Sequence, residues 1–288
     1  MQQQTGPILL ATDLSACSDR ALDRALQLAE QHQTKLIVVH IMTPNGSPGL
    51  TTPVWCRLTP DHKVLAERRL ADDLADCKVP TEVLIMTGDP VKYITEAAQT
   101  HNCSLIVTDI ARDETLDRLL LGNTVKKLAR KVQQPILVVK SRPRHAYRNV
   151  LVATDFSNGS RQAITAGLNV AGDAALTLFH GYNVPFQGKN TPDDAVSRSF
   201  HNAAEENVKE FIANTPDLCE RPAPTLVLQA GQPKTLLSEY VFNERSELVV
   251  TGTHSLTGIL RTAIGSVAER LLEALPCDVL IVRQIEGK

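Results

Sequence analysis

The segment PILLATDLSACS (7–18) returns later in the chain as NVLVATDFSNGS (149–160), and this repetition decides the fold. In each copy an aliphatic run ends on Thr-Asp, and a helical pattern of small and aliphatic residues follows. A short aliphatic run of this kind is typical of a buried strand. The match sets Asp13 against Asp155, so the same strand, turn and helix are expected twice.

Four further segments repeat in the same order, at offsets of 140 to 143 residues. Five ordered matches do not arise by chance, so two homologous halves follow one another in the chain. The basic, proline-containing SRPRHAYR (141–148) separates a first domain, 1–142, from a second, 149–288. The other matched pairs are KLIVVHI (35–41) with ALTLFHG (175–181), TEVLIMTGDPVKYI (81–94) with PTLVLQAGQPKTLL (224–237), SLIVTDI (104–110) with ELVVTGT (247–253), and LLLGNTVKKLARKVQQPILVV (119–139) with TAIGSVAERLLEALPCDVLIV (262–282).

Each half alternates short apolar runs with helical patterns, which predicts an α/β fold. Runs that are apolar along their whole length indicate parallel strands covered on both faces. We therefore expect in each half an open, mostly parallel, five-stranded sheet of the Rossmann-like type with helices on both faces. Ligands bind such sheets outside the carboxyl ends of the strands. In the first half the runs are ILLAT (8–12), LIVVHI (36–41), TEVLIM (81–86), LIVTD (105–109) and ILVV (136–139).

Composition narrows the class of protein. The 288 residues carry a net charge of −2 and only 4% aromatic residues, which gives no basis for binding nucleic acid or a membrane surface. The first residues, MQQQTGPILLATD, lack the basic and apolar regions of a signal peptide. The six cysteines form no C-x-x-C pair, and His101-x-Cys103 has no second pair to complete a metal site. A cytoplasmic protein with reduced thiols and no metal ligands is expected.

The polar residues after the first strand admit two interpretations. Asp13 with Ser15, and Asp155 with Ser157, stand where a carboxylate could accept hydrogen bonds from a ribose hydroxyl or an adenine amino group. The same residue types also cap helices, because their oxygens accept from backbone N–H groups in the first turn. The duplication does not decide between these interpretations, since a cap would be copied too.

A second candidate feature is the loop between the fourth strand and the last helix of the second half. Gly252 ends the strand, and Gly265-Ser266-Val267 opens the helix. Backbone N–H groups at a helix N-terminus attract phosphate, and glycine lets an oxygen approach the backbone closely. The loop therefore favours a phosphate-binding site.

The repeat and this loop together make the whole chain resemble a tandem universal stress protein, which has two copies of a domain of roughly 140 residues. ATP-binding members of that family carry G-x2-G-x9-G-[S/T] here, and Gly252, Ser255 and Gly265-Ser266 meet the spacing. Ser255 replaces the family's second glycine, at a cost on the order of 1 kcal/mol if that position needs a positive φ. In the first half the same spacing gives Asp109, Arg112 and Gly122-Asn123. The Asp109 carboxylate would face the polyphosphate and repel it, so a degenerate site is expected there.

The resemblance implies a set of binding residues in the second half. Three residues would line the adenine and ribose, one after the second strand would offer its backbone to the base, and the loop would surround ribose and phosphates. His40 and His180, which end the second strands, are interpreted as structural. The implied set is Ala153, Thr154 and Asp155, then Gly181, then Thr251, Gly252, His254, Ser255, Gly265, Ser266 and Val267.

The function expected from the resemblance is a cytoplasmic stress-resistance regulator that binds ATP, with or without Mg²⁺, in its second domain. No catalytic residue is assigned, because the chain has neither a G-x-x-x-x-G-K-[ST] loop nor a G-x-S-x-G elbow, so ATP hydrolysis would be slow at most. The resemblance also implies that the last strands (136–139 and 279–282) pair in an intramolecular pseudo-dimer, and leaves a homodimer open. The alternatives are an interaction module without nucleotide and an enzyme acting on another nucleotide-containing or lipid-linked substrate.

Overall fold

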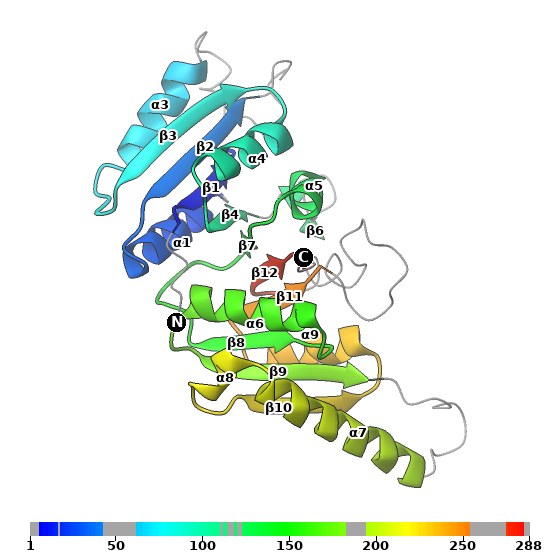
Figure 1. The fold of residues 1–288 in the computed structure, drawn as a ribbon. Helices are drawn as coiled ribbons and strands as arrows, with labels where there is room; N and C mark the ends of the chain where they lie inside the picture. The colour runs from blue at the N-terminus through cyan, green and yellow to red at the C-terminus, as the bar shows by residue number, and fades with distance from the viewer. Residues whose placement is uncertain are drawn as a thin grey trace. The chain divides into compact units, whose positions relative to one another are not determined.

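The computed structural model describes residues 6–16, 18–42, 62–109, 112–113, 118–119, 123–182, 194–253 and 275–284 (Figure 1). The chain divides between Arg144 and His145 into two compact units, the first half and the second half. This division falls inside the segment SRPRHAYR.

The described strands of the first half form a parallel sheet in the order β3-β2-β1-β4-β7. The predicted five-stranded sheet is therefore confirmed. A two-residue pair of strands, β5 and β6, is antiparallel and separate from it. The elements are β1 (Ile8–Thr12), α1 (Ser18–Gln31), β2 (Leu36–Met42), α3 (His62–Asp73), β3 (Thr81–Thr87), α4 (Pro90–Thr100), β4 (Leu105–Asp109), β5 (Arg112–Asp113), β6 (Arg118–Leu119), α5 (Asn123–Lys131) and β7 (Ile136–Val139).

The second half repeats this arrangement, with described strands in the parallel order β10-β9-β8-β11-β12. The duplication seen in the sequence is thus a duplication of topology. The elements are β8 (Asn149–Ala153), α6 (Asn158–Ala171), β9 (Ala175–Tyr182), α7 (Asp194–Ala213), α8 (Pro216–Cys219), β10 (Thr225–Ala230), α9 (Pro233–Asn243), β11 (Leu248–Gly252) and β12 (Asp278–Val282).

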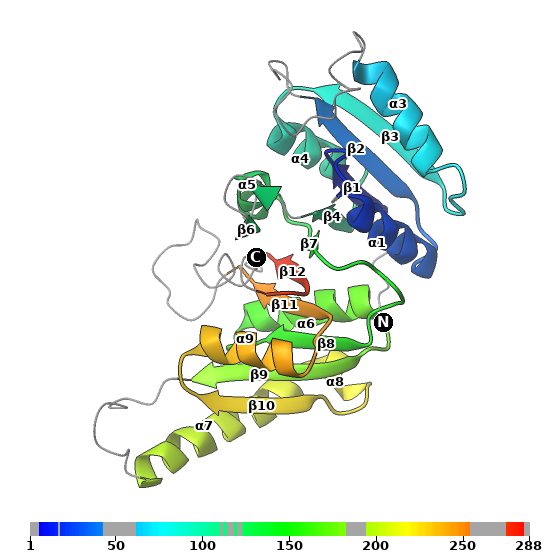
Figure 2. The same cartoon turned by 180° about the vertical axis from the view of Figure 1, so that it is seen from behind.

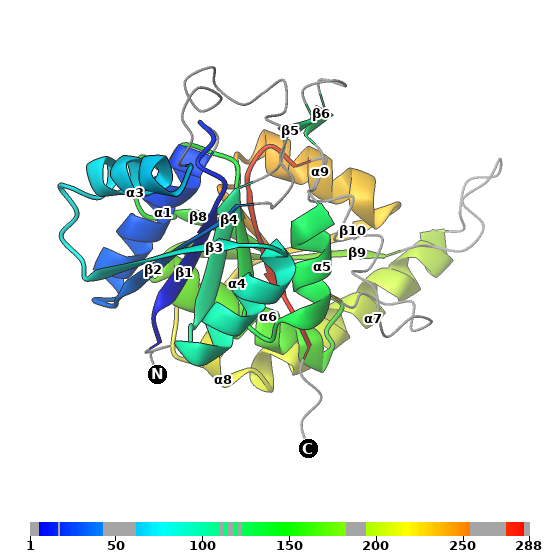
Figure 3. The ribbon, with the colours of Figure 1, turned by 90° about the horizontal axis from the view of Figure 1, so that it is seen from above.

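Helices cover both faces of each sheet because crossovers between parallel strands are right-handed. From β1 to β3 the chain moves one way across the sheet, and from β3 to β7 it returns past β1. A fixed hand therefore places α1 and α3 on one face and α4 and α5 on the other, as the front and back views show (Figures 1 and 2). In the second half α6 and α7 lie on one face and α9 on the other, which the view from above also lets the reader follow (Figure 3).

The core of each half lies between its sheet and these helices. Leu9 and Leu10 of β1, like Val249 and Val250 of β11, are fully buried although neighbouring side chains point to opposite faces. A strand buried on both faces needs an uninterrupted apolar sequence, which is the pattern seen in these runs. Small residues let the helices approach: Gly167 of α6 lies so close to β11 that an added Cβ would meet Val250 Cγ2 at 2.9 Å.

Gly181, near the end of β9, lies very close to the backbone of a helix. Among the described glycines of the second half, it is the one whose added Cβ would come nearest to a backbone atom. A Cβ built there would lie 2.8 Å from the Cα of Pro233, the first residue of α9. Backbone cannot yield as a flexible side chain can. Packing of α9 on β9 therefore accounts for glycine at this position.

We expect Gly181→Ala to lower the free energy of unfolding by about 1–3 kcal/mol, the usual cost of overpacking. Equilibrium urea unfolding followed by circular dichroism measures the change. Thr225→Ala, at an exposed position on β10, is the control and should stay within about 0.5 kcal/mol of the parent. Equal stability of the alanine variant at 181 and the parent would contradict the packing account.

Candidate functional site

The candidate site of the second half lies at the carboxyl ends of β8 and β11. These strands are neighbours, with Val150 opposite Leu248 and Val152 opposite Val250. From β8 the chain continues to its neighbour β9, and from β11 it continues to β12, in the opposite direction along the sheet. The ends of β8 and β11 therefore form the topological switch point. Ligands bind open α/β sheets at this point. The structure thus brings Asp155, directly after β8, to the same edge as Gly252.

The turn that follows the first strand has the same geometry in both halves. The threonine hydroxyl oxygen accepts the N–H two residues on, from Leu14 to Thr12 and from Phe156 to Thr154, each at 3.0 Å. The aspartate Oδ1 accepts the serine N–H that follows, at 2.8 Å for Asp13 and 3.0 Å for Asp155. These bonds fix the position of the aspartate at the carboxyl end of the first strand in each half.

The residue between Asp and Ser has a left-handed backbone, with φ of 61° at Leu14 and 64° at Phe156. Residues with a Cβ rarely adopt this conformation, so the surroundings must hold it. At Phe156 the ring packs 4.3 Å from the His180 ring and 5.5 Å from the Phe211 ring, centroid to centroid. This aromatic layer lies between β9 and α7 and was not foreseen from the sequence.

A histidine ties the second strand to this turn in each half. Nδ1 of His40 lies 3.0 Å from the Thr12 carbonyl oxygen, and Nδ1 of His180 lies 2.8 Å from that of Thr154. A carbonyl oxygen can only accept, so Nδ1 carries the hydrogen in both rings. The interpretation of these histidines as structural is therefore supported.

The helix cap of the second half is Ser157 and not Asp155. Ser157 Oγ accepts the N–H of Ser160 at 3.2 Å, at the start of α6. Asp155 instead accepts the Ser160 hydroxyl on Oδ1 at 2.6 Å, and Ser160 Oγ accepts the Asp155 N–H at 3.1 Å. Of the two interpretations of the Thr-Asp-x-Ser segment, capping thus belongs to the serine, and the binding role of the aspartate stays a prediction.

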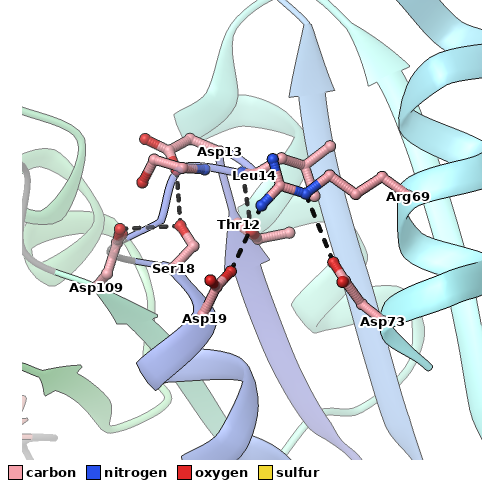
Figure 4. Close-up of polar contacts among 9 residues, drawn as sticks. Thr12, Asp13, Leu14, Ser18, Asp19, Arg69, Asp73 and Asp109 are labelled. Carbon is pink, nitrogen blue, oxygen red and sulfur yellow. Dashed lines mark hydrogen bonds and ion pairs between the residues drawn. The ribbon is translucent and has the colours of Figure 1, made fainter. Parts of the chain in front are cut away.

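In the first half the corresponding edge carries a second carboxylate. Ser18, which matches Ser160 in the repeat, donates to Asp13 Oδ1 at 2.7 Å and lies 2.9 Å from Asp109 Oδ2 (Figure 4). Asp109 ends β4, where Gly252 ends β11. Among the described residues, the ends of the fourth strands differ in that one half has the acidic Asp109 and the other has Gly252. Sequence reasoning missed the serine, although the repeat itself aligns Ser18 with Ser160.

Proximity and burial set the acidity of these carboxyl groups. Burial, and then the charge of Asp13, raise the pKa of Asp109 to about 6, although the Ser18 hydrogen bond opposes this. Burial also acts to raise the pKa of Asp13, but hydrogen bonds from Ser18 and Ser15 outweigh it, so that pKa is lowered. The half-buried Asp109 carboxyl group is thus a weaker acid than Asp13 beside it.

The described residues include only part of the predicted set. Ala153, Thr154, Asp155, Thr251 and Gly252 lie together at the carboxyl ends of β8 and β11, and Gly181 lies near the end of the adjoining β9. Thr251 is buried, with 4% of its surface exposed. The remaining predicted residues fall outside the described ranges: His254, Ser255, Gly265, Ser266 and Val267 in the second half, and Gly122 in the first.

This fold, with polar residues at the switch point of a doubly wound parallel sheet, defines an α/β protein of the adenine nucleotide α-hydrolase-like type. A family model described as the universal stress protein family matches residues 5–140 and again 146–283. The chain therefore belongs to the universal stress protein family and carries two of its domains in tandem, which confirms the resemblance seen in the sequence.

The chain is similar to three individual proteins in different degrees. A putative universal stress protein of Staphylococcus aureus strain USA300 is 31% identical over 149 residues, which cover 49% of this chain and 86% of that protein. The crystal structure of a putative universal stress protein from Pseudomonas aeruginosa UCBPP-PA14 covers 98% of this chain and 95% of its own, at 20% identity and a TM-score of 0.72. A universal stress protein from Archaeoglobus fulgidus, solved in complex with dAMP, covers 47% of this chain and 98% of its own, at 19% identity and a TM-score of 0.35.

Two features are absent from the described residues. None of their helices combines the length and the apolar character needed to cross a bilayer. In the same residues, no three His, Cys, Asp or Glu side chains are grouped as metal ligands would be.

We expect Thr154→Val to lower the free energy of unfolding by about 1–2 kcal/mol, because the Phe156 N–H loses its acceptor while side-chain shape is kept. Thr154→Ser retains the hydroxyl and is the matched control, expected to lose less. Urea unfolding of both variants measures the difference. If the serine variant were as unstable as the valine variant, the hydroxyl would not be what holds the turn.

Proposed function

We propose that this protein is a stress-response regulator that binds ATP in its second domain, at the carboxyl ends of β8 and β11, and hydrolyses it slowly at most. The observation that carries the proposal is the difference between positions 252 and 109. Gly252 adds no side chain at the switch point, whereas Asp109 puts a half-buried carboxyl group there in the first half.

Asp155 would contact the ribose hydroxyls or the adenine amino group. Its carboxylate is held by the Ser157 N–H and the Ser160 hydroxyl, at 3.0 Å and 2.6 Å. Both hydrogen bonds end on Oδ1 and belong to the turn itself, so the group is oriented without a ligand. An oriented acceptor binds at a lower entropic cost than a mobile one.

The phosphates would be bound by the loop that follows Gly252. Its sequence motif, Gly252, Ser255 and Gly265-Ser266, supports this assignment by spacing, and the loop beyond Thr253 lies outside the described residues. Backbone N–H groups at a helix N-terminus suit the phosphates of ATP, whether or not the nucleotide brings Mg²⁺ with it. Ala153, Thr154 and Thr251 would complete the walls, and Gly181 would offer its backbone to the base.

We expect the purified chain to bind ATP and Gly252→Asp to weaken that binding by at least about tenfold, because a carboxylate beside a phosphate repels it. Isothermal titration calorimetry measures the affinity. Asn243→Asp adds the same charge at the end of α9, beyond the amino edge of β11, and is the control with unchanged affinity. The double variant Gly252→Asp with Asp109→Gly tests whether the first domain gains ATP binding when the second domain loses it.

The same experiment distinguishes the alternative function. If the parent chain binds no ATP in calorimetry and releases no nucleotide when heat-denatured protein is passed over an anion-exchange column, the ATP proposal is wrong. The duplicated fold would then act as an interaction module without nucleotide.

A further inference from the structure

The contacts at the edge of the first sheet require more hydrogen atoms than the serine can supply. Ser18 Oγ lies 2.7 Å from Asp13 Oδ1 and 2.9 Å from Asp109 Oδ2, both within hydrogen-bond distance (Figure 4). A hydroxyl group has one hydrogen and donates to one acceptor at a time. The second contact is a hydrogen bond only if the carboxyl group on that side carries a proton and donates to Ser18 Oγ.

The three groups come from three different elements. Asp13 follows β1, Ser18 opens α1, and Asp109 ends β4. When one proton is present in addition to that of the hydroxyl, Asp109 donates to Ser18 and Ser18 donates to Asp13, in an uninterrupted chain. When the proton is lost, two carboxylates compete for one hydrogen and repel each other across the junction of β1 and β4.

We propose that this edge of the first domain is a proton-binding site, at which Asp13, Ser18 and Asp109 hold one exchangeable proton, and that loss of the proton at neutral pH loosens the junction of β1, α1 and β4. The proton leaves for solvent, and no other reactant is required.

The charged groups around the site are consistent with a proton held on Asp109. Burial first, and the charge of Asp13 second, raise the pKa of Asp109 to about 6. Burial raises the pKa of Asp13, but hydrogen bonds from Ser18 and Ser15 and the charge of His40 on β2 lower it by more. The proton therefore belongs to Asp109, and Asp13 is the carboxylate that accepts from Ser18.

Neighbouring cations make other contacts. Arg20 Nη1 of α1 donates to the Lys140 carbonyl oxygen at 2.7 Å, and Lys140 itself is buried after β7. On α3, Arg69 pairs with Asp19 of α1 at 3.6 Å and with Asp73 at 3.7 Å. The causes that set the pKa of Asp109 are burial, the charge of Asp13 and hydrogen bonds, and not these cations.

The direction of the pH effect follows from linkage. The pKa of Asp109 rises from an ordinary 3.8 to about 6 in the folded chain. A carboxyl group with a raised pKa favours folding only while it is protonated, so its contribution is complete below about pH 4 and is lost as the pH rises through 6. The difference of about two units corresponds to about a 100-fold change in the folding equilibrium of the first half.

We expect hydrogen exchange of the full chain to show this loss. The protection factors of amides in β1 and β4, corrected for intrinsic exchange, should fall by about 30-fold between pH 4.5 and 7.5 relative to Asp109→Asn, because part of the loss is already complete at pH 4.5. The asparagine can donate to Ser18 at every pH, so that variant is the reference. A ratio of parent to variant that stays constant across this range would overturn the proposal.

The second half provides a matched control within the same molecule. Ser160 donates to Asp155, and Gly252 stands where the other half has Asp109. The protection of β8 and β11 relative to Asp155→Asn should therefore show no step between pH 5 and 7. A step of equal size in both halves would mean that the effect does not arise from the paired carboxyl groups, and the proposal would fail.

A measurement on the parent chain avoids dependence on the folding of any one variant. The ¹³Cγ resonance of Asp109, followed by NMR over pH 3 to 8, should titrate with a midpoint near 6. Asp13→Asn removes the neighbouring charge and should move this midpoint to lower pH. An Asp109 midpoint near 4 in the parent, or one that Asp13→Asn does not move, contradicts a shared proton.

Discussion

In each half, hydrogen bonds in the turn after the first strand fix the position of the aspartate at the candidate site. A threonine oxygen and an aspartate oxygen accept backbone N–H groups within three residues, and a histidine from the next strand donates to the threonine carbonyl. The first two bonds are local, whereas the histidine and the packing around the left-handed residue come from elsewhere in the fold. The start of the helix and the position of the aspartate both follow from this turn, which explains how Asp13 and Asp155 come to lie at the same edge of their sheets.

The two halves show how little needs to change for such an edge to change its chemistry. Their strand orders correspond, their turns agree in hydrogen bonding and in the left-handed residue, and Ser18 occupies the place of Ser160. The difference is at the end of the fourth strand, where one half has Asp109 and the other Gly252. On the two proposals made above, a second carboxyl group at this edge turns a site for an anion into one that retains a proton.

Most of the fold could be predicted from the sequence, because buried parallel strands carry uninterrupted apolar runs and the repeat doubles every such signal. The site could be predicted only in outline. The repeat placed Asp155 and Gly252 at one edge, but a sequence does not show which oxygen meets which donor, so Ser18 and Ser160 were overlooked. The reason for Gly181 was also invisible, since the close approach of Pro233 depends on how α9 packs. The roles of residues 254–267 stay predictions that rest on spacing and resemblance.

The covalent joining of two copies has a genetic consequence. In an assembly of identical chains, a substitution such as glycine to aspartate at the end of the fourth strand appears in every copy at once, and both sites change together. Here codons 109 and 252 mutate independently, so one copy can diverge while the other keeps its earlier chemistry. Each molecule therefore carries one edge of each kind in a fixed one-to-one ratio, which no mixing of subunits can alter.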